Sequence, residues 1–284
     1  MARAIPRVAR RRRADSYSRR FIVNRPLLAG LCVGLSLATS ISAFADDKGD
    51  AIAQAYYGLA KASDTKADAT MTLIDKSGAK KIRKLQINYR ETSEGKDAYL
   101  VFAEPADVAG TKFLTLAHKN AEGEQRLYLP ALKKTRKISS ASKDGAFVNS
   151  DFSFYDLEDR KFSDNAYTFL AGGATIDDKA FDGMKFDKVE MRPADPNAPY
   201  SKCVAYANQA DHFIYKLECY DKKDGALLKT ILFVQVENLK GHLIPTQTLV
   251  SNNKAGTKTL LAMSNVQVDV GASADLFTEA NLEK

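Results

Sequence analysis

The amino-acid sequence predicts a mainly β protein built on a large, curved antiparallel sheet. Short segments rich in β-branched and aromatic residues alternate apolar with polar side chains. Gly, Pro, Asn and Asp separate these segments at short intervals, as they do in turns. Helical spacing is clear in residues 50–62, where Ile52, Tyr56 and Leu59 share one face and Asp50 could cap the first turn.

Residues 1–45 have the order of a secretory signal peptide. A cluster of arginines precedes an apolar stretch over residues 26–44, and Ala43-Phe44-Ala45 gives an A-x-A cleavage signal. We expect cleavage after Ala45, export to the periplasm, and a single domain over residues 46–284. A membrane anchor is less favoured because the apolar core is short, and lipidation of Cys32 is disfavoured because the bulky Leu31 precedes it.

The net charge of the whole chain is misleading. It is +7, which suggests a nucleic-acid partner. Removing the nine arginines and the one aspartate of residues 1–45 leaves 33 basic and 34 acidic residues, a net charge of −1. We therefore expect no nucleic-acid partner for the exported protein.

The strands can be placed from their alternation. We expect about eleven to thirteen of them. Gly172-Gly173 predicts a β-bulge inside one strand, and residues 273–282 predict a short helix or turn. The expected strands are residues 69–73, 82–90, 99–102, 111–116, 126–129, 135–139, 166–176, 184–191, 200–207, 213–220, 227–236, 243–250 and 257–270.

An aromatic cluster interrupts the strands between residues 147 and 155. It contains Phe147, Phe152, Phe154 and Tyr155. Ser153 and Asp156 have the spacing of a capping box, so we expect a helix to begin near Phe154. The residues alone allow either a surface helix that covers one end of the sheet or a lid over a hydrophobic cavity.

A basic hairpin carries Lys133, Lys134, Arg136 and Lys137. Such charges typically form a solvated edge that blocks pairing with another sheet. A docking patch for anionic lipid or for an acidic partner is the less favoured alternative.

The residues give no pattern typical of catalysis. His118, His212 and His242 lie far apart, and no cysteine pair has metal-ligand spacing. The acidic residues between 104 and 159 fit turn and capping positions better than an acid–base pair. We therefore expect no catalytic residue, no metal and no cofactor. The acidic residues considered are Glu104, Asp107, Asp151, Asp156, Glu158 and Asp159.

Three motifs resemble a known family. They are FAEPADVAGTKFL (residues 102–114), LYLPALKKTRKI (residues 127–138) and SDFSFYDLED (residues 150–159). Together they are similar to the LolA-like outer-membrane lipoprotein-sorting proteins, and a weaker similarity continues to residues 276–277. The resemblance implies an unclosed β-barrel with a few short helices in its concave mouth, and it favours the lid. It also implies an inner-membrane transporter as a partner, and we expect a monomer.

Three functions follow from these observations. The first is a periplasmic carrier that binds acyl chains of a lipoprotein or lipid in a hydrophobic cavity and transfers them between the inner and outer membranes without covalent chemistry. The second is a structural or adaptor protein of a membrane transport complex. The third, an enzyme, has almost no support in the sequence.

The candidate cavity residues are apolar side chains of the central strands and of the aromatic cluster. A simple core would use the same residues but pack them more completely. A register error of one residue would turn a strand's whole set to the other face. The candidates are Leu85, Ile87, Tyr89, Leu100, Phe102, Phe113, Leu127, Leu129, Phe152 and Phe154.

Cys203 and Cys219 are predicted to form a disulfide. Export removes Cys32 and leaves two cysteines in an oxidising compartment. A hairpin that turns about Asp211 places residues 203 and 219 directly opposite each other, within reach of a bridge. The alternative is two buried free thiols.

Overall fold

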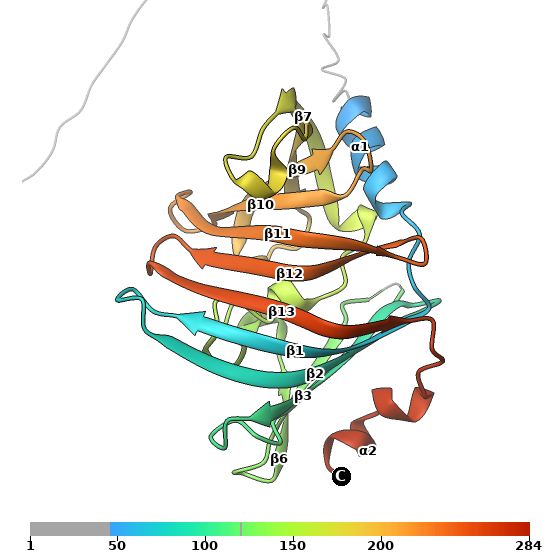
Figure 1. Ribbon diagram of the computed structural model, residues 1–284, viewed down its shortest axis with the longest axis vertical. Helices are drawn as coiled ribbons and strands as arrows, with labels where there is room; N and C mark the ends of the chain where they lie inside the picture. Colours follow the sequence, from blue (N-terminus) through green and yellow to red (C-terminus); the bar gives the residue numbers. More distant parts are fainter. Residues whose placement is uncertain (1–45, 120) are drawn as a thin grey trace, which may run out of the picture. The chain divides into compact units, whose positions relative to one another are not determined.

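The computed structural model describes residues 46–119 and 121–284. The expected signal peptide, its cleavage point after Ala45 and Cys32 lie outside the described residues. Within these residues, thirteen strands form one antiparallel sheet, which confirms the predicted fold class (Figure 1). The right-handed twist of successive strands gives such a sheet its curvature.

Two meanders make up the sheet, and each follows the chain order. The first consists of β1 (Asp64–Ile74), β2 (Lys80–Thr92), β3 (Gly95–Glu104), β4 (Lys112–Leu116), β5 (Glu124–Leu129) and β6 (Lys134–Ile138). The second consists of β7 (Asn165–Ala174), β8 (Phe186–Pro193), β9 (Tyr200–Asn208), β10 (Ile214–Asp221), β11 (Leu227–Leu239), β12 (His242–Asn252) and β13 (Thr257–Val268).

The two meanders join where β13 pairs with β1. The resulting strand order is β6-β5-β4-β3-β2-β1-β13-β12-β11-β10-β9-β8-β7, so β6 and β7 are the two edges of the sheet. Because the edges do not pair with each other, the sheet is an unclosed barrel. The predicted bulge in β7 is confirmed, since its register with β8 shifts between Ala171 and Ala174.

Helix α1 (Asp47–Tyr57) begins and ends earlier than predicted. The capping residue is Asp46, whose carboxylate accepts a hydrogen bond from the Gly49 amide at 3.1 Å, and the prediction of Asp50 as the cap was wrong. The second oxygen of Asp46 accepts from the Phe169 amide of β7. A tertiary contact therefore fixes the start of the helix, and helical spacing alone could not reveal it.

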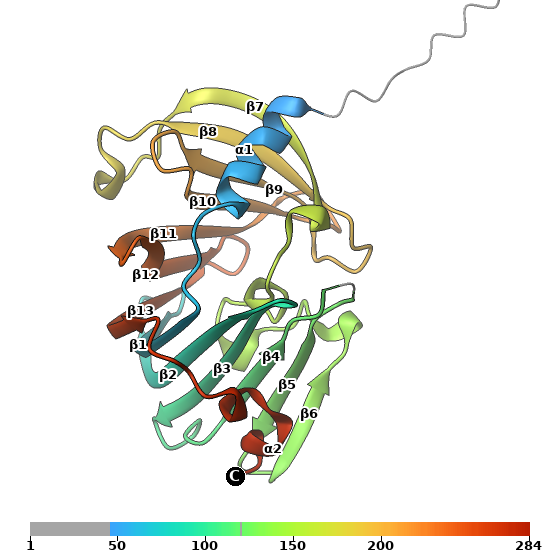
Figure 2. The same cartoon turned by 90° about the vertical axis from the view of Figure 1, so that its right-hand side faces the viewer.

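Helix α1 packs on the strands at the β7 edge (Figure 2). Its Ala53 lies against Tyr167 and Val189. The approach is close, since a Cβ added to Gly49 would lie 2.8 Å from the Phe169 nitrogen. A glycine is therefore needed where the helix meets the strand.

The predicted disulfide is confirmed. Cys203 of β9 pairs directly with Cys219 of β10, and their sulfur atoms are 2.04 Å apart. The bridge closes a short hairpin loop, so it stabilises the fold mainly by restricting the unfolded chain.

Two further segments cover the sheet, and we name them by position. The inner cover, residues 139–164, connects β6 to β7 and must therefore run from one edge of the sheet to the other. The outer cover, residues 272–284, follows β13 and contains α2 (Glu279–Leu282). None of the helices in the described residues is long and apolar enough to span a membrane.

The inner cover contains only short 3₁₀ turns. The predicted capping box is present, because the Ser153 amide donates to the Asp156 carboxylate at 2.7 Å and the Asp156 amide donates to the Ser153 hydroxyl at 3.3 Å. The helix that it begins is a single 3₁₀ turn at Tyr155–Leu157. The other turns are Ser140–Ser142, Phe147–Asn149 and Phe162–Asp164.

Candidate functional site

The strand register places the candidate cavity residues on one face of the sheet. Ile87, Leu100, Phe113 and Leu127 are direct partners across β2, β3, β4 and β5. Directly opposite residues in antiparallel strands project to the same side of a sheet. Leu85 pairs with Phe102 in the same way and so extends the row.

The concave face of the sheet bears this row, because side chains from distant strands converge there on the inner cover. Ile231 of β11 and Val250 of β12 belong to the same buried cluster as Phe113 of β4. Only the inside of a curved sheet brings strands so far apart in the sheet order to one place.

Aromatic rings of the inner cover fill this concave face. Phe147 is fully buried, and its ring centroid lies 5.0 Å from that of Phe113 and 5.8 Å from that of Phe102. Phe154 lies 5.8 Å from both Phe113 and Phe147. The apolar space enclosed by the sheet is therefore occupied by the chain's own side chains.

All ten candidate cavity residues contribute to this one cluster, eight as buried members and Tyr89 and Leu129 as half-buried neighbours. The sequence analysis missed Phe147 as a site residue, although its place in the aromatic cluster was a usable signal. It also missed side chains of β1, β11, β12 and β13, which the curvature of the sheet brings to the same cluster. These are Met71, Ile231, Phe233, Val250, Leu261 and Met263.

A buried ion pair attaches the inner cover to the sheet. The Lys229 ammonium of β11 lies 2.5 Å from the Asp156 carboxylate, and both side chains are less than a tenth exposed. The Tyr200 hydroxyl donates to the other oxygen of Asp156 at 2.6 Å. Burial and then the nearby Asp156 charge raise the pKa of Tyr200 well above its usual value, so the phenol stays protonated and can donate.

Hydrogen bonds attach the inner cover at three more points. The Asp151 amide donates to the Thr259 hydroxyl of β13 at 2.9 Å, and the Asp151 carboxylate accepts from the same hydroxyl at 2.7 Å. The buried Gln125 amide donates to the Phe154 carbonyl at 2.8 Å. The Arg83 guanidinium donates to the Val148 carbonyl.

The backbone of the inner cover is strained beside Phe147. Val148 has φ 45° and ψ 47°, and Asn149 has φ 56°. The left-handed region is uncommon for any residue except glycine and is a clear outlier for a β-branched one. Such a residue costs on the order of 1–3 kcal/mol, which the surrounding contacts must offset.

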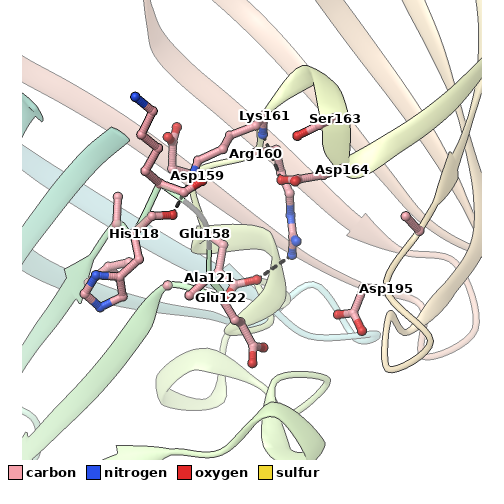
Figure 3. Close-up of a pocket in the computed structure, with 15 residues that line it drawn as sticks. His118, Ala121, Glu122, Glu158, Asp159, Arg160, Lys161, Ser163, Asp164 and Asp195 are labelled. Atoms are coloured by element: carbon pink, nitrogen blue, oxygen red, sulfur yellow. Dashed lines mark hydrogen bonds and ion pairs between the residues drawn. The ribbon is translucent and has the colours of Figure 1, made fainter. Parts of the chain in front are cut away.

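A polar cavity of about 600 Å³ lies beside the apolar cluster (Figure 3). It is lined by the turn between β4 and β5 and by the end of the inner cover, and Thr115, two residues from Phe113, belongs to its wall. The Arg160 guanidinium contacts the Glu158 carboxylate at 2.6 Å, and the Lys161 ammonium donates to the Lys119 carbonyl at 2.9 Å.

Ion pairs join some of the charges at this cavity. Glu158 contacts both Arg160 and Lys143, and Lys143 also lies 2.5 Å from Glu122. Such pairing holds these side chains in place. The described residues contain no cluster of three or more His, Cys, Asp or Glu side chains that could hold a metal ion.

Comparison with known proteins identifies related chains. A family model described as an uncharacterized protein matches residues 94–284. Curated proteins give no match. Among solved structures, a domain described as an outer membrane lipoprotein-sorting protein from Vibrio parahaemolyticus has 29% identity and a TM-score of 0.78, covering 84% of this chain and 100% of that one.

Two more solved structures share the architecture. A DUF1329 family protein from Desulfovibrio piger has 25% identity and a TM-score of 0.77, covering 84% of this chain and 99% of that one. A LolA superfamily protein from Nitrosomonas europaea has 18% identity and a TM-score of 0.63, covering 82% and 98%, and this likeness concerns the fold alone. By its unclosed sheet and by these relatives, the chain belongs to a LolA-like family.

Proposed function

We propose that the protein is a periplasmic carrier that binds the acyl chains of a lipoprotein or lipid on the concave face of the sheet. It transfers them between the inner and outer membranes without covalent chemistry. The description of the Vibrio parahaemolyticus relative as a lipoprotein-sorting domain supports this class of cargo. An inner-membrane transporter would load the protein.

One observation carries the proposal. The concave face is lined by the sheet and filled by a separate segment, whose rings of Phe147 and Phe154 lie against Phe102 and Phe113. That segment is an irregular connection with short turns, so it can leave without disrupting the strand pairing. Its departure would open an apolar space on a rigid sheet.

The energetics allow an exchange. Burying an acyl chain contributes about 0.8 kcal/mol per CH₂, so a chain of about fifteen CH₂ groups gains on the order of 12 kcal/mol. Withdrawing Phe147 and Phe154 from the cluster costs a few kcal/mol for each ring. For an acyl chain taken from water, the gain exceeds the loss of these two ring contacts, while the protein without cargo keeps its apolar surface covered.

The polar cavity has a matching role. Its wall includes Thr115, two residues from Phe113 of the apolar cluster, and charged side chains that favour contact with water. We assign it to the polar part of the cargo, which has to remain in water while the acyl chains are buried.

Binding of a fluorescent fatty acid tests this proposal. We expect Phe154→Asp to abolish binding, because a carboxylate in the cluster would be desolvated by an acyl chain. Phe277→Asp is the matched control, since Phe277 is equally buried but belongs to the outer cover. Each variant is first checked for folding by circular dichroism, and equal binding by both folded variants would contradict the proposal.

Native lipid content gives a second readout that needs no variant. The protein purified without detergent should release acyl-chain lipids or acylated peptide on solvent extraction, as detected by mass spectrometry. An extract free of acyl chains, together with no binding of the added fatty acid, would favour the adaptor function.

Export is a separate part of the proposal. The intact mass of the periplasmic protein should correspond to a chain that begins at Asp46. A mass that includes residues 1–45, or one with an acyl group on Cys32, would contradict it.

A further inference from the structure

The most exposed large apolar side chain among the described residues stands at the tip of a hairpin. Leu132 is 62% exposed and lies in the turn between β5 and β6. Polar residues and glycine are usual at such positions. Leu129 at the base of the same turn packs against the apolar cluster of the concave face.

Exposed cations surround Leu132 on the basic hairpin, residues 129–138. Lys133, Lys134, Arg136 and Lys137 are all exposed. Lys137 lies 2.6 Å from the Glu124 carboxylate, whereas the other three have no carboxylate within 4 Å among the described residues. The hairpin therefore concentrates positive charge on a protein whose residues 46–284 have a net charge of −1.

We propose that the basic hairpin is a docking surface for a membrane that contains anionic phospholipids. Lysine and arginine side chains near such a surface each contribute about 1 kcal/mol of attraction, and an apolar tip can enter the interfacial region. The hairpin thereby holds the edge of the concave face against the bilayer. The inference goes beyond the proposed carrier function, because it does not depend on what the concave face binds.

The combination of side chains favours a bilayer over an acidic protein. An acidic protein would match the cations but gives no reason for a leucine at the tip. A sheet edge protected from pairing likewise needs the charges and not the leucine. An anionic bilayer accommodates both features at once.

The position of the hairpin fits this role. It lies at the β6 edge of the sheet, beside the turn between β3 and β4, where a Cβ added to Gly110 would be 3.5 Å from Pro130 (Figure 1). Pro130 restricts the backbone at the start of the turn. The tip is therefore presented on a supported turn and not on a long flexible loop.

Vesicle co-sedimentation tests the inference. The protein purified from the periplasm is mixed with phosphatidylcholine vesicles, or with vesicles in which roughly a third of the lipid is phosphatidylglycerol. We expect binding to the anionic vesicles alone, weakened by high salt. Lys133→Gln/Lys134→Gln should lower the affinity about 25-fold, which is about fivefold for each lysine.

A control variant separates the hairpin from net charge. Lys80→Gln/Lys81→Gln removes the same charge from two exposed lysines beside another exposed apolar residue, Ile82. Its affinity should stay within about twofold of the wild type, because charges more than about one Debye length from the bilayer are screened from it. Leu132→Asn should weaken binding several-fold without changing the salt dependence.

Three outcomes would overturn the inference. The first is a wild-type protein that does not bind anionic vesicles, and the second is an equal loss in the control variant. The third is an unchanged affinity of Leu132→Asn, which would leave a purely electrostatic patch suited to an acidic protein. Thermal unfolding of each variant confirms that the exposed substitutions preserve the fold.

Discussion

The inner and outer covers bury opposite faces of the same strands by different means. On β4, Phe113 faces the inner cover and Leu114 faces the outer cover, and both are fully buried. The outer cover packs Phe277 and Leu282 against Leu114. Its polar contacts lie near the surface, such as the Arg126–Glu279 pair at 2.7 Å.

The inner cover is attached by buried polar groups instead. Lys229 and Asp156 are nearly inaccessible to water, and Val148 has an unfavourable backbone conformation. Apolar packing would provide the same burial without either feature. The outer cover is thus joined to the sheet mainly by apolar packing, whereas the inner cover adds buried polar contacts that fix it in one position.

The largest effect that separates the two covers should come from the buried ion pair. Lys229→Met leaves the Asp156 charge unpaired in the interior and should lower the free energy of unfolding by about 3–5 kcal/mol. Arg126→Met in β5 removes the more exposed pairs with Glu124 and with Glu279 of the outer cover, and should cost no more than about 1 kcal/mol. Urea denaturation measures both.

A double variant identifies the cause of the larger loss. Asp156→Asn/Lys229→Met removes both charges and should recover part of the stability lost in Lys229→Met. If the double variant is less stable than the single one, the lysine acts through packing, and the proposed electrostatic attachment is wrong.

A smaller effect is expected from the strained backbone. Asparagine tolerates the left-handed region, so Val148→Asn should raise the stability of the cargo-free protein by about 1 kcal/mol. Because the inner cover then leaves the concave face less easily, the affinity for a fatty acid should fall about fivefold. Both quantities can be measured by thermal unfolding and by fluorescence titration.

His212→Asn provides the control for this prediction. His212 has φ 62° in the turn between β9 and β10, outside the inner cover. The substitution should relieve strain without changing the fatty-acid affinity. An affinity that falls equally in both variants would contradict the special role of Val148.

The smallest effects should have opposite dependence on pH. Burial raises the pKa of Glu158 in the inner cover, and this effect outweighs the nearby Arg160 and Lys143, which lower the pKa. Glu158 therefore stabilises the folded protein at low pH, and this stabilisation is lost as the pH rises through the pKa of Glu158. Burial also acts to raise the pKa of Asp64, but amide hydrogen bonds from Val270 and Gly271 lower it overall. Asp64, which lies beside the outer cover, therefore stabilises the folded protein above about pH 4, and this stabilisation is lost as the pH falls.

Two substitutions separate these pH effects. In Glu158→Gln, stability should no longer fall as the pH rises through the pKa of Glu158. In Asp64→Asn, stability should fall less steeply as the pH is lowered below about 4. The measurement is the denaturation midpoint as a function of pH. Shifts in the same direction for both variants would show that the two carboxylates have similar surroundings.

The sequence predicted the strands and the disulfide because both depend on local patterns. Alternation placed Leu85 and Ile87 on the same face of their strand, and the hairpin register brought Cys203 opposite Cys219. The short helix or turn over residues 273–282 was predicted and is confirmed, but the packing of the outer cover on the sheet was not predicted. The continuous apolar runs around Leu100 and Leu114 were a signal that both faces of these strands are buried.

Long-range contacts explain the rest. The position of Lys229 in β11 gives no local sign that it will meet Asp156 in a connection far away in the chain. The start of α1 is fixed by Asp46, whose carboxylate accepts a hydrogen bond from the Phe169 amide of β7. Features of this kind arise only when the sheet curves and brings distant segments together.

The central claim is that the inner cover occupies the place of an acyl chain. Phe147→Ala and Phe277→Ala should each destabilise the protein by about 3–5 kcal/mol, since both rings are buried. The decisive measurement is the rise in melting temperature when a long-chain fatty acid is added. The rise should be larger in Phe147→Ala than in the wild type and unchanged in Phe277→Ala, whereas equal rises, or none, would contradict the claim.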